Sequence, residues 1–314
     1  MNGIEVKNLT KKFGKFTSVN NISFNVKKGE VFGFLGANGA GKSTTIRMLC
    51  GILRPTSGDA IVGGYSVINQ PDKVKTKIGY MSQKFSLYDD LTVQENINFF
   101  GGIYGLDKDI LEERKNWVLS IADLKGNEHF LTASLPKGIK QRLALGIAVI
   151  HRPEIVFLDE PTSGVDPIAR RNFWELINSL SEEGTTVVVT THYLEEAEYC
   201  NNIILMDSGK LIADGNPKKL KTKYLNNKIL EIECDNTIDA IDILSKQEFS
   251  IDINIFGNSV HLSVNEKCKN YAQIKTILEE NGLVVYDIRE ILPSLEDVFI
   301  HLVKKKNENK KHTF

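Results

Sequence analysis

The sequence predicts an α/β fold followed by a small α+β domain, and three observations support this prediction. A glycine-rich loop at residues 36–44 stands between a short apolar run and a helical pattern. A second apolar run, at residues 155–158, is followed at once by two carboxylates. After a polar, lysine-rich stretch around residues 218–227, the elements follow the order β-α-β-β-α-β, which is the ferredoxin-like arrangement.

The glycine-rich loop matches the pattern G-x-x-x-x-G-K-[S/T]. Its members are Gly36, Ala37, Asn38, Gly39, Ala40, Gly41, Lys42, Ser43 and Thr44. Residues 31–35 predict a buried strand before it, and residues 45–50 predict a helix after it. Inward-turned backbone N–H groups and the helix N-terminus suit phosphate groups, so we expect a nucleoside triphosphate here. A chance match in a glycine-rich turn is the alternative, and both flanks argue against it.

The two carboxylates after residues 155–158 are Asp159 and Glu160, at the strand end where open α/β sheets place their ligands. Mg²⁺ needs hard oxygen ligands, and three residues can supply them directly or through water. These are Ser43, Gln83 and Asp159. Glu160 can accept a proton from an attacking water, while Lys42 and His192 can stabilise charge on a γ-phosphate. Taken alone, His192 is more often a capped strand end, and the carboxylates could form a solvated surface pair.

The remaining patterns predict further subdomains. Alternation at residues 4–7 and 22–26 predicts antiparallel strands that lead into the buried strand. Helical spacing over residues 92–121 predicts a helical subdomain, which we place at about 84–150. We expect Pro136 at the first position of the helix that follows it. Phe13, which precedes a glycine, packs in a core or turn or else stacks on a purine ring.

Composition narrows the class of protein. The 314 residues are 41% hydrophobic and 25% charged, with a formal net charge of −1, so no basic excess indicates a nucleic-acid partner. No apolar run approaches the length of a bilayer span, and the N-terminus lacks a secretion-signal pattern. Four separated cysteines without a C-x-x-C pair fit reduced thiols. We therefore expect a cytosolic chain that can dock onto a membrane protein.

The domain boundaries follow from composition and pattern. We place the first domain at residues 1–220, a linker at 221–228, the ferredoxin-like domain at 229–303 and a basic tail at 304–314. The tail holds five lysines, which favours a solvated, disordered end. Attraction to an anionic membrane surface is the less favoured interpretation.

Taken together, these motifs resemble the ATP-binding cassette (ABC) family, the nucleotide-hydrolysing subunits of membrane transporters. The resemblance covers nearly all of residues 1–220 and rests on Phe13, residues 36–44, Gln83, 135–142, 155–160, 163–166 and His192. It implies a P-loop NTPase cassette with a RecA-like core, an antiparallel β-subdomain and a helical subdomain, using ATP and Mg²⁺. It also implies that Phe13 stacks on adenine, Gln83 senses magnesium, Glu160 is the general base and residues 164–166 communicate across a dimer.

One motif departs from the family. The usual Leu-Ser-Gly-Gly-Gln signature is replaced at residues 135–139 by Leu-Pro-Lys-Gly-Ile. Gly138 keeps the second glycine, and by resemblance it faces the nucleotide of a partner cassette. Pro136 replaces a serine and offers neither hydroxyl nor N–H, whereas Lys137 brings a charge that can compensate. ATP binding is therefore expected, and a binding module with little turnover is an alternative to an active ATPase.

Further motifs are similar to the branch that drives type 2 exporters of drugs, lipids or polysaccharides. They are residues 141–146, 161–167, 173–174 and 293–299. This resemblance implies an ATPase subunit on the cytoplasmic face of the membrane, in a head-to-tail homo- or heterodimer with a second cassette, serving a separate permease. Phe85, Leu87 and Tyr88 are candidates for the permease groove, with core packing as the alternative. A soluble cassette ATPase acting on ribosomes or DNA is the alternative function.

Overall fold

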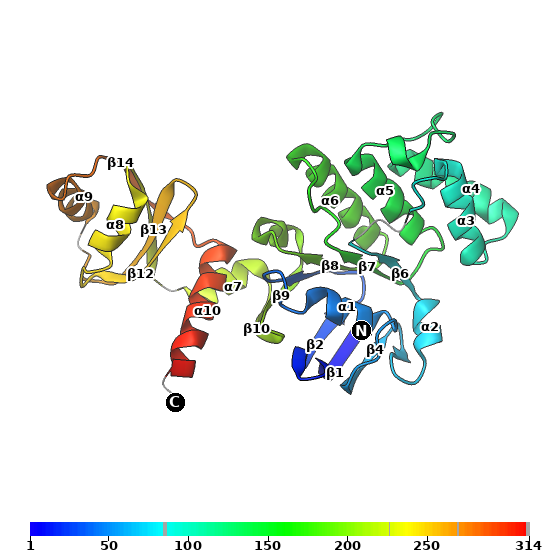
Figure 1. Ribbon diagram of the computed structural model, residues 1–314, viewed down its shortest axis with the longest axis horizontal. Coiled ribbons are helices and arrows are strands. Elements are labelled where there is room, and N and C mark those ends of the chain that lie inside the picture. Colours follow the sequence, from blue (N-terminus) through cyan, green and yellow to red (C-terminus); the bar gives the residue numbers. More distant parts are fainter. Residues whose placement is uncertain (84–86, 226, 269, 312–314) are drawn as a thin grey trace. The chain divides into compact units, whose positions relative to one another are not determined.

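The computed structural model describes residues 1–83, 87–225, 227–268 and 270–311, which form two compact units (Figure 1). The first unit is Met1–Pro217 and the second is Lys218–Phe314. The division comes a few residues before the linker predicted at 221–228. Helix α7 (Pro217–Tyr224) includes the first residues of that stretch, and strand β11 (Lys228–Cys234) begins at its last residue.

A six-stranded sheet in the order β10-β9-β3-β8-β7-β6 forms the centre of the first unit. Its strands are β3 (Val31–Leu35), β6 (Ile78–Met81), β7 (Ile155–Asp159), β8 (Thr186–Thr191), β9 (Asn202–Asp207) and β10 (Lys210–Gly215). All pairs are parallel except β9 with β10. Every residue of β3, β7 and β8 is buried, as expected for apolar strands covered on both faces. The predicted α/β core is confirmed.

Helices and a second sheet cover the two faces of this core (Figure 1). Helices α5 (Lys137–Ala148) and α6 (Pro167–Glu182) lie on one face, and α1 (Lys42–Leu49) lies on the other. The second sheet has the order β2-β1-β4-β5. Its strands are β1 (Asn2–Phe13), β2 (Phe16–Lys27), β4 (Ser57–Val62) and β5 (Tyr65–Ser66), all antiparallel.

The two sheets share one hydrophobic core. Phe24 of β2 lies edge-on to Phe34 of β3, with ring centroids 5.2 Å apart, and stacks with Phe32 at 5.9 Å. Buried residues of α1, including Ile46 and Leu49, belong to the same cluster. Aromatic pairs at these distances add to the gain from burying their surface. This packing holds α1 against β3 and the second sheet.

The predicted helical subdomain is confirmed by α3 (Val93–Ile103), α4 (Lys108–Ile121), the short helix η1 (Thr132–Ser134) and α5. Two other short helices, α2 (Pro71–Lys75) and η2 (Leu194–Tyr199), lie outside it in the same unit. Thr92 and Glu95 form a reciprocal capping box that begins α3. Arg114 of α4 is buried and donates hydrogen bonds to the carbonyl oxygens of Val149 and Ile150 just after α5. The subdomain is thereby tied to the core through the end of α5.

The second unit has the predicted ferredoxin-like order. Its elements are β11, α8 (Thr237–Leu244), β12 (Ser250–Phe256), β13 (Ser259–Val264), α9 (Tyr271–Glu280), β14 (Val285–Ile291) and α10 (Leu295–Lys311). The strands form one antiparallel sheet, ordered β12-β13-β11-β14. Ile274 and Leu278 of α9 join Leu244 of α8 and the apolar side of the sheet in a separate core.

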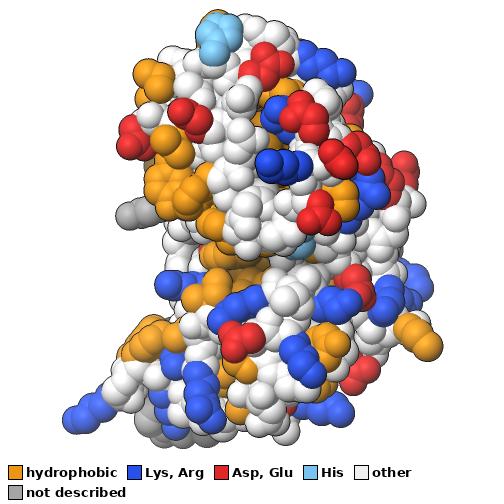
Figure 2. Space-filling model, turned by 90° about the vertical axis from the view of Figure 1, so that its right-hand side faces the viewer, with side chains coloured by type: hydrophobic (Ala, Val, Ile, Leu, Met, Phe, Trp, Pro, Cys, Tyr) orange, Lys and Arg blue, Asp and Glu red, His pale blue; other side chains and the backbone are white. Residues whose placement is uncertain are grey.

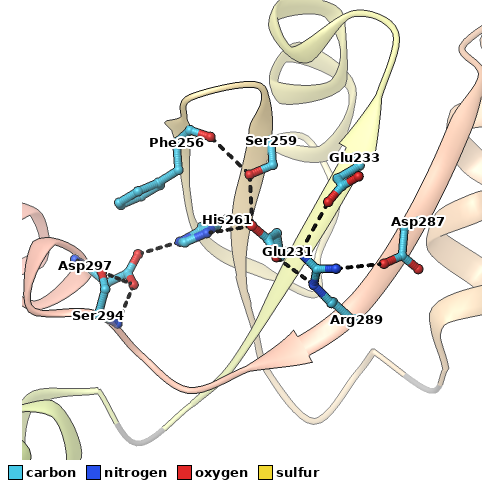
Figure 3. Close-up of polar contacts among 9 residues, drawn as sticks. All are labelled: Glu231, Glu233, Phe256, Ser259, His261, Asp287, Arg289, Ser294 and Asp297. Carbon is cyan, nitrogen blue, oxygen red and sulfur yellow. Dashed lines mark hydrogen bonds and ion pairs between the residues drawn. The ribbon is translucent and has the colours of Figure 1, made fainter. Parts of the chain in front are cut away.

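The opposite side of this sheet carries a polar network (Figure 3). His261 Nδ1 lies 3.0 Å from Asp297 Oδ1, and its Nε2 lies 3.8 Å from Glu231 Oε1. Asp297 also accepts hydrogen bonds from the backbone and hydroxyl of Ser294, while Arg289 pairs with Glu231. Burial would raise the pKa of Asp297, but the hydrogen bonds from His261 and Ser294 outweigh it and lower that pKa.

Helix α10 is longer than the sequence predicts. It continues to Lys311, so the expectation of a disordered tail from Lys304 is wrong for residues 304–311. Lys304 donates hydrogen bonds to Asp252 Oδ1 at 2.6 Å and to Asn254 Oδ1 at 2.7 Å, both on β12. These contacts tie Lys304, the first residue beyond the predicted helix end, to the sheet. Within the described ranges, no helix combines the length and the apolar character needed to cross a membrane.

Candidate nucleotide site

The glycine-rich loop connects β3 to α1, as predicted. Gly41 precedes the helix with φ 106°, and a Cβ there would lie 2.6 Å from the Ser18 carbonyl oxygen. Any side chain at this position would therefore be strained and would collide with β2. None of the described side chains caps α1, so its first N–H groups remain available to an anion.

Lys42 is folded back onto its own loop. Its ammonium group donates hydrogen bonds to the carbonyl oxygens of Gly36 at 2.7 Å and Ala37 at 3.3 Å. It also lies 3.5 Å from Glu160 Oε1, and the side chain is only 4% exposed. Burial lowers the pKa of Lys42, although the negative charges of Glu160 and Asp159 oppose that shift. The lysine is thus held beside the loop at the position where phosphate groups are expected.

Asp159 ends β7 and faces the start of α1. Its Oδ1 accepts a hydrogen bond from Ser43 Oγ at 2.9 Å and another from Thr190 Oγ1 at 2.6 Å. The side chain is buried, so these donors replace the water that the carboxylate would otherwise bind. Ser43 and Asp159, two of the three predicted magnesium ligands, are in direct contact.

Glu160 lies at the centre of the site. Gln83 Nε2 donates a hydrogen bond to its Oε2 at 3.0 Å, and His192 Nδ1 lies 3.3 Å from the same oxygen. Its backbone has φ 49°, an uncommon value for a residue other than glycine, and its N–H bonds to both oxygens of Thr190. This strained turn directs the carboxylate toward Lys42, Gln83 and His192.

A cavity of about 360 Å³ lies over the loop. Its lining residues are Phe16, Ser18, Asn38, Gly39, Gly41, Lys42, Ser43, Thr44, Gln83 and Glu160. Most of the predicted residues are therefore brought together. Asp159 lies behind Ser43, and His192 reaches the site through Glu160.

The aromatic residue at the cavity differs from the predicted one. Phe16, at the start of β2, lines the cavity, whereas Phe13, its partner across the β1–β2 turn, does not. Both rings are exposed, and the Lys11 ammonium lies 5.3 Å from the centroid of Phe13. Sequence reasoning missed Phe16. A second aromatic three residues after the first, across a glycine turn, was the available signal.

Two further residues of the site were not predicted. Ser18 Oγ donates a hydrogen bond to Thr44 Oγ1 at 3.0 Å and so joins β2 to the loop. Thr190 holds both Asp159 and the Glu160 backbone. The sequence places Thr190 at the end of a predicted strand, but a threonine there gives no chemical signal beyond strand propensity.

The altered signature lies away from this cavity. Pro136 is the cap of α5, one position earlier than predicted, and Lys137 is the first helical residue. Gly138 is not among the residues that line the cavity. The Lys137 ammonium lies against Gly164, where it is 2.5 Å from the position that a Cβ would occupy, and Gly164 has φ 68°. The signature and the turn at residues 163–166 are thus in contact.

Comparisons with known proteins agree with this geometry. A family model described as ABC transporter matches residues 19–163, and one described as ATP-binding protein DrrA1-3-like, C-terminal domain, matches residues 215–303. A dimeric ATP-binding cassette, solved in a post-hydrolysis state with ADP and Pi, superposes with a TM-score of 0.63 at 27% identity. That alignment covers 68% of this chain and 98% of the other.

Curated relatives extend the match. "Probable multidrug ABC transporter ATP-binding protein YbhF" of Escherichia coli (strain K12) is 52% identical over 224 residues, which are 71% of this chain and 39% of that protein. The chain therefore spans about two fifths of that relative. "Linearmycin resistance ATP-binding protein LnrL" of Bacillus subtilis (strain 168) is 34% identical over 306 residues, covering 95% of this chain and 97% of the relative. The chain belongs to the ATP-binding cassette family of ABC transporters, in the branch that carries a DrrA1-3-like C-terminal domain.

Proposed function

We propose that this protein is the ATP-hydrolysing subunit of an ABC exporter, acting with a separate membrane permease that carries a drug, lipid or polysaccharide. The observation that carries the proposal is the position of Glu160. Its carboxylate is held between Lys42, Gln83 and His192 at the edge of a phosphate-binding loop. A carboxylate so placed can accept the proton of a water that attacks the γ-phosphate.

Three residues of the site would hold Mg²⁺. Ser43 and Asp159 present hydroxyl and carboxylate oxygens in contact at 2.9 Å, and Gln83 lies beside them on the cavity wall. Such hard oxygen donors suit this ion. When bound, Mg²⁺ would neutralise charge on the β- and γ-phosphate oxygens.

Lys42 and His192 would stabilise the negative charge of the phosphates, by a positive charge or by hydrogen bonds. Lys42 has two carbonyl partners and Glu160, so it must exchange at least some of these contacts to bind an incoming phosphate. That exchange releases Glu160 to face a water. His192 stays beside Glu160 and can donate to the γ-phosphate. Phe16 lines the cavity and can offer its ring to the adenine, and Phe13 is its partner across the β1–β2 turn.

A second cassette completes the site in this proposal. By family resemblance, Gly138 and the start of α5 face the nucleotide of the partner in a head-to-tail dimer. The exposed position of Pro136 and Lys137 supports this arrangement. The complex would assemble on the cytoplasmic face of the membrane.

An aromatic surface on the helical subdomain supports docking of a permease. Tyr88 is 47% exposed and Phe99 is 43% exposed, with ring centroids 5.0 Å apart, and Phe100 lies 5.3 Å from Phe99. Figure 2 shows this side of the cassette, where hydrophobic side chains reach the surface between charged ones. Of the predicted groove residues, Leu87 is buried and Phe85 lies outside the described residues. Tyr88 with Phe99 is thus the proposed docking surface.

The substitution Glu160→Gln tests the proposal. It keeps the shape of the side chain and removes the base, so we expect ATP hydrolysis to fall on the order of 10²–10⁴-fold while ATP stays bound. Glu154→Gln is the matched control, since Glu154 precedes the same strand but pairs with Lys77 at the surface. A parental rate in Glu160→Gln would show that the role given to Glu160 is wrong. Co-purification only with ribosomes or DNA, rather than with a multi-span membrane protein, would overturn the transport role.

A further inference from the structure

A buried carboxylate, Glu196 of η2, lies near the catalytic residues and has no part in the mechanism above. It is 2% exposed and accepts a hydrogen bond from Thr162 Oγ1 at 2.6 Å. Arg170 of α6 approaches it, with Nε 3.6 Å from Glu196 Oε1. The other oxygen of Glu196 has no hydrogen-bond partner among the described residues. Burying a carboxylate with one oxygen unpaired costs free energy of folding, which indicates that Glu196 has a role other than stability.

Arg170 connects three segments of the chain. Besides Glu196, its guanidinium donates a hydrogen bond to the Val165 carbonyl oxygen at 3.4 Å. It also lies over the ring of Tyr193, 4.4 Å from the centroid. A planar guanidinium can make an ion pair, a carbonyl contact and a ring contact at once, which an ammonium group cannot. Arg170 thus joins α6 to the turn at residues 163–166 and to the segment after β8.

Both ends of this set of contacts reach Glu160. On one side, the Ser163 N–H bonds to the Glu160 carbonyl oxygen at 3.2 Å, and the Val165 N–H bonds to the Thr162 carbonyl oxygen at 3.2 Å. On the other side, the ring of Tyr193 lies against that of His192 with centroids 4.1 Å apart. His192 in turn lies 3.3 Å from the Glu160 carboxylate. The contacts form a closed circuit from Glu160 through Glu196 and Arg170 back to Glu160.

We propose that Arg170 and Glu196 are positioning residues for ATP hydrolysis: together they hold His192 and the turn at residues 162–166 in register with Glu160. The inference rests on the roles proposed above for Glu160 and His192. Neither residue of the pair lines the nucleotide cavity, so the pair acts on the geometry of the catalytic groups and not on nucleotide binding. Small displacements of catalytic groups are costly because reacting atoms must be closely aligned.

Arg170→Met tests the inference in the full-length chain. It keeps the length and apolar stem of the side chain and removes the ion pair, the carbonyl contact and the ring contact. We expect kcat per nucleotide-binding site to fall about 10- to 100-fold, with KM for ATP and the affinity for ADP within about twofold of the parent. Normalising the rate to bound ADP removes any loss caused by misfolded protein.

Arg171→Met is the matched control. Arg171 is the next residue of α6, is largely exposed and pairs only with Glu175 among the described residues, at 3.5 Å. We expect parental kcat in this variant. Glu196→Gln keeps an acceptor for Thr162 but removes the charge, and should lower kcat as Arg170→Met does. Arg170→Lys keeps a positive charge opposite Glu196, so its kcat should lie between those of the parent and Arg170→Met.

The outcomes separate this inference from the proposed function. If kcat of Arg170→Met equals that of Arg171→Met, the positioning role is wrong while Glu160 keeps its role. The same holds if the whole effect of Arg170→Met lies in KM. If Arg170→Met does not fold, the near-isosteric Glu196→Gln tests the positioning role instead, through its kcat per nucleotide-binding site and its KM for ATP. A parental rate in Glu160→Gln overturns the roles on which the inference rests.

Discussion

Helices α1 and α5 both begin without a side-chain cap, yet their surroundings differ. At α1, the lysine of the first turn is satisfied, because Lys42 reaches two loop carbonyls and Glu160. At α5, Pro136 offers no capping oxygen and no acidic residue lies in the first turn. Lys137, the first residue of α5, has neither a hydrogen bond nor an ion pair with any described residue, and its charge adds to the positive end of the helix dipole.

Only the α1 half of the proposed site is complete in a single chain. The α1 half has its own cations, carboxylates and cavity. The α5 half has the positive end of the helix dipole and the ammonium of Lys137, which has no carboxylate partner among the described residues, whereas Lys140 pairs with Asp89 at 2.9 Å. This difference agrees with a site assembled from two cassettes, in which the phosphates held at one α1 also face the α5 of the partner.

Removing the cation of the α1 half should have the largest effect on binding. Lys42→Met keeps the buried stem and deletes the ammonium group, so we expect affinity for ATP to fall by about 1.5–3 kcal/mol, the usual worth of a hydrogen bond to a charged group. Titration of the variant with a fluorescent ATP analogue measures the loss. Lys137→Met serves as the comparison, since Lys137 lies outside the cavity of its own chain. Equal losses in the two variants would contradict the division into halves.

Gly164→Ala should destabilise the α5 half. The residue has φ 68°, and its Cβ would meet the Lys137 ammonium, so we expect a loss of about 1–2 kcal/mol from the left-handed backbone plus the displacement of Lys137. Gly105→Ala is the control, because Gly105 has φ 67° with nothing within 4 Å of its Cβ position. Denaturant unfolding measures both. If the two variants also have equal ATPase rates, the contact between Lys137 and Gly164 has no part in turnover.

Restoring a capping serine should have the smallest effect. Pro136→Ser supplies a side-chain oxygen for the first N–H groups of α5, and we expect about 0.5–2 kcal/mol of added stability. ATP turnover should be preserved or raised. Pro136→Ala removes the proline without adding an oxygen and is the control in both the unfolding and ATPase measurements. A collapse of turnover in Pro136→Ser alone would mean that this branch requires the proline.

The sequence predicted the α1 half well because its residues carry chemistry at fixed spacing. The loop at residues 36–44 and the acids after residues 155–158 are visible without any structure. Phe16, Thr190 and Glu196 escaped prediction, because their roles depend on tertiary neighbours far away in the sequence. The ferredoxin-like domain was predicted from the order of its elements. The helical structure of residues 304–311 was not predicted, because a lysine-rich segment is ordinarily solvated. The acceptors that bind Lys304 lie about fifty residues earlier in the chain.

The attachment of α10 has a consequence for how the protein can be shortened. Asp297, near the start of the helix, bonds to His261 of the sheet (Figure 3). Lys304, further along the helix, donates a hydrogen bond to Asp252 of the same sheet. A truncation before residue 295 would remove the carboxylate opposite His261 and the ammonium opposite Asp252. The exposed sheet would then keep polar groups without their internal partners. Helix α10 is therefore part of this domain, and a minimal version of the domain must include it.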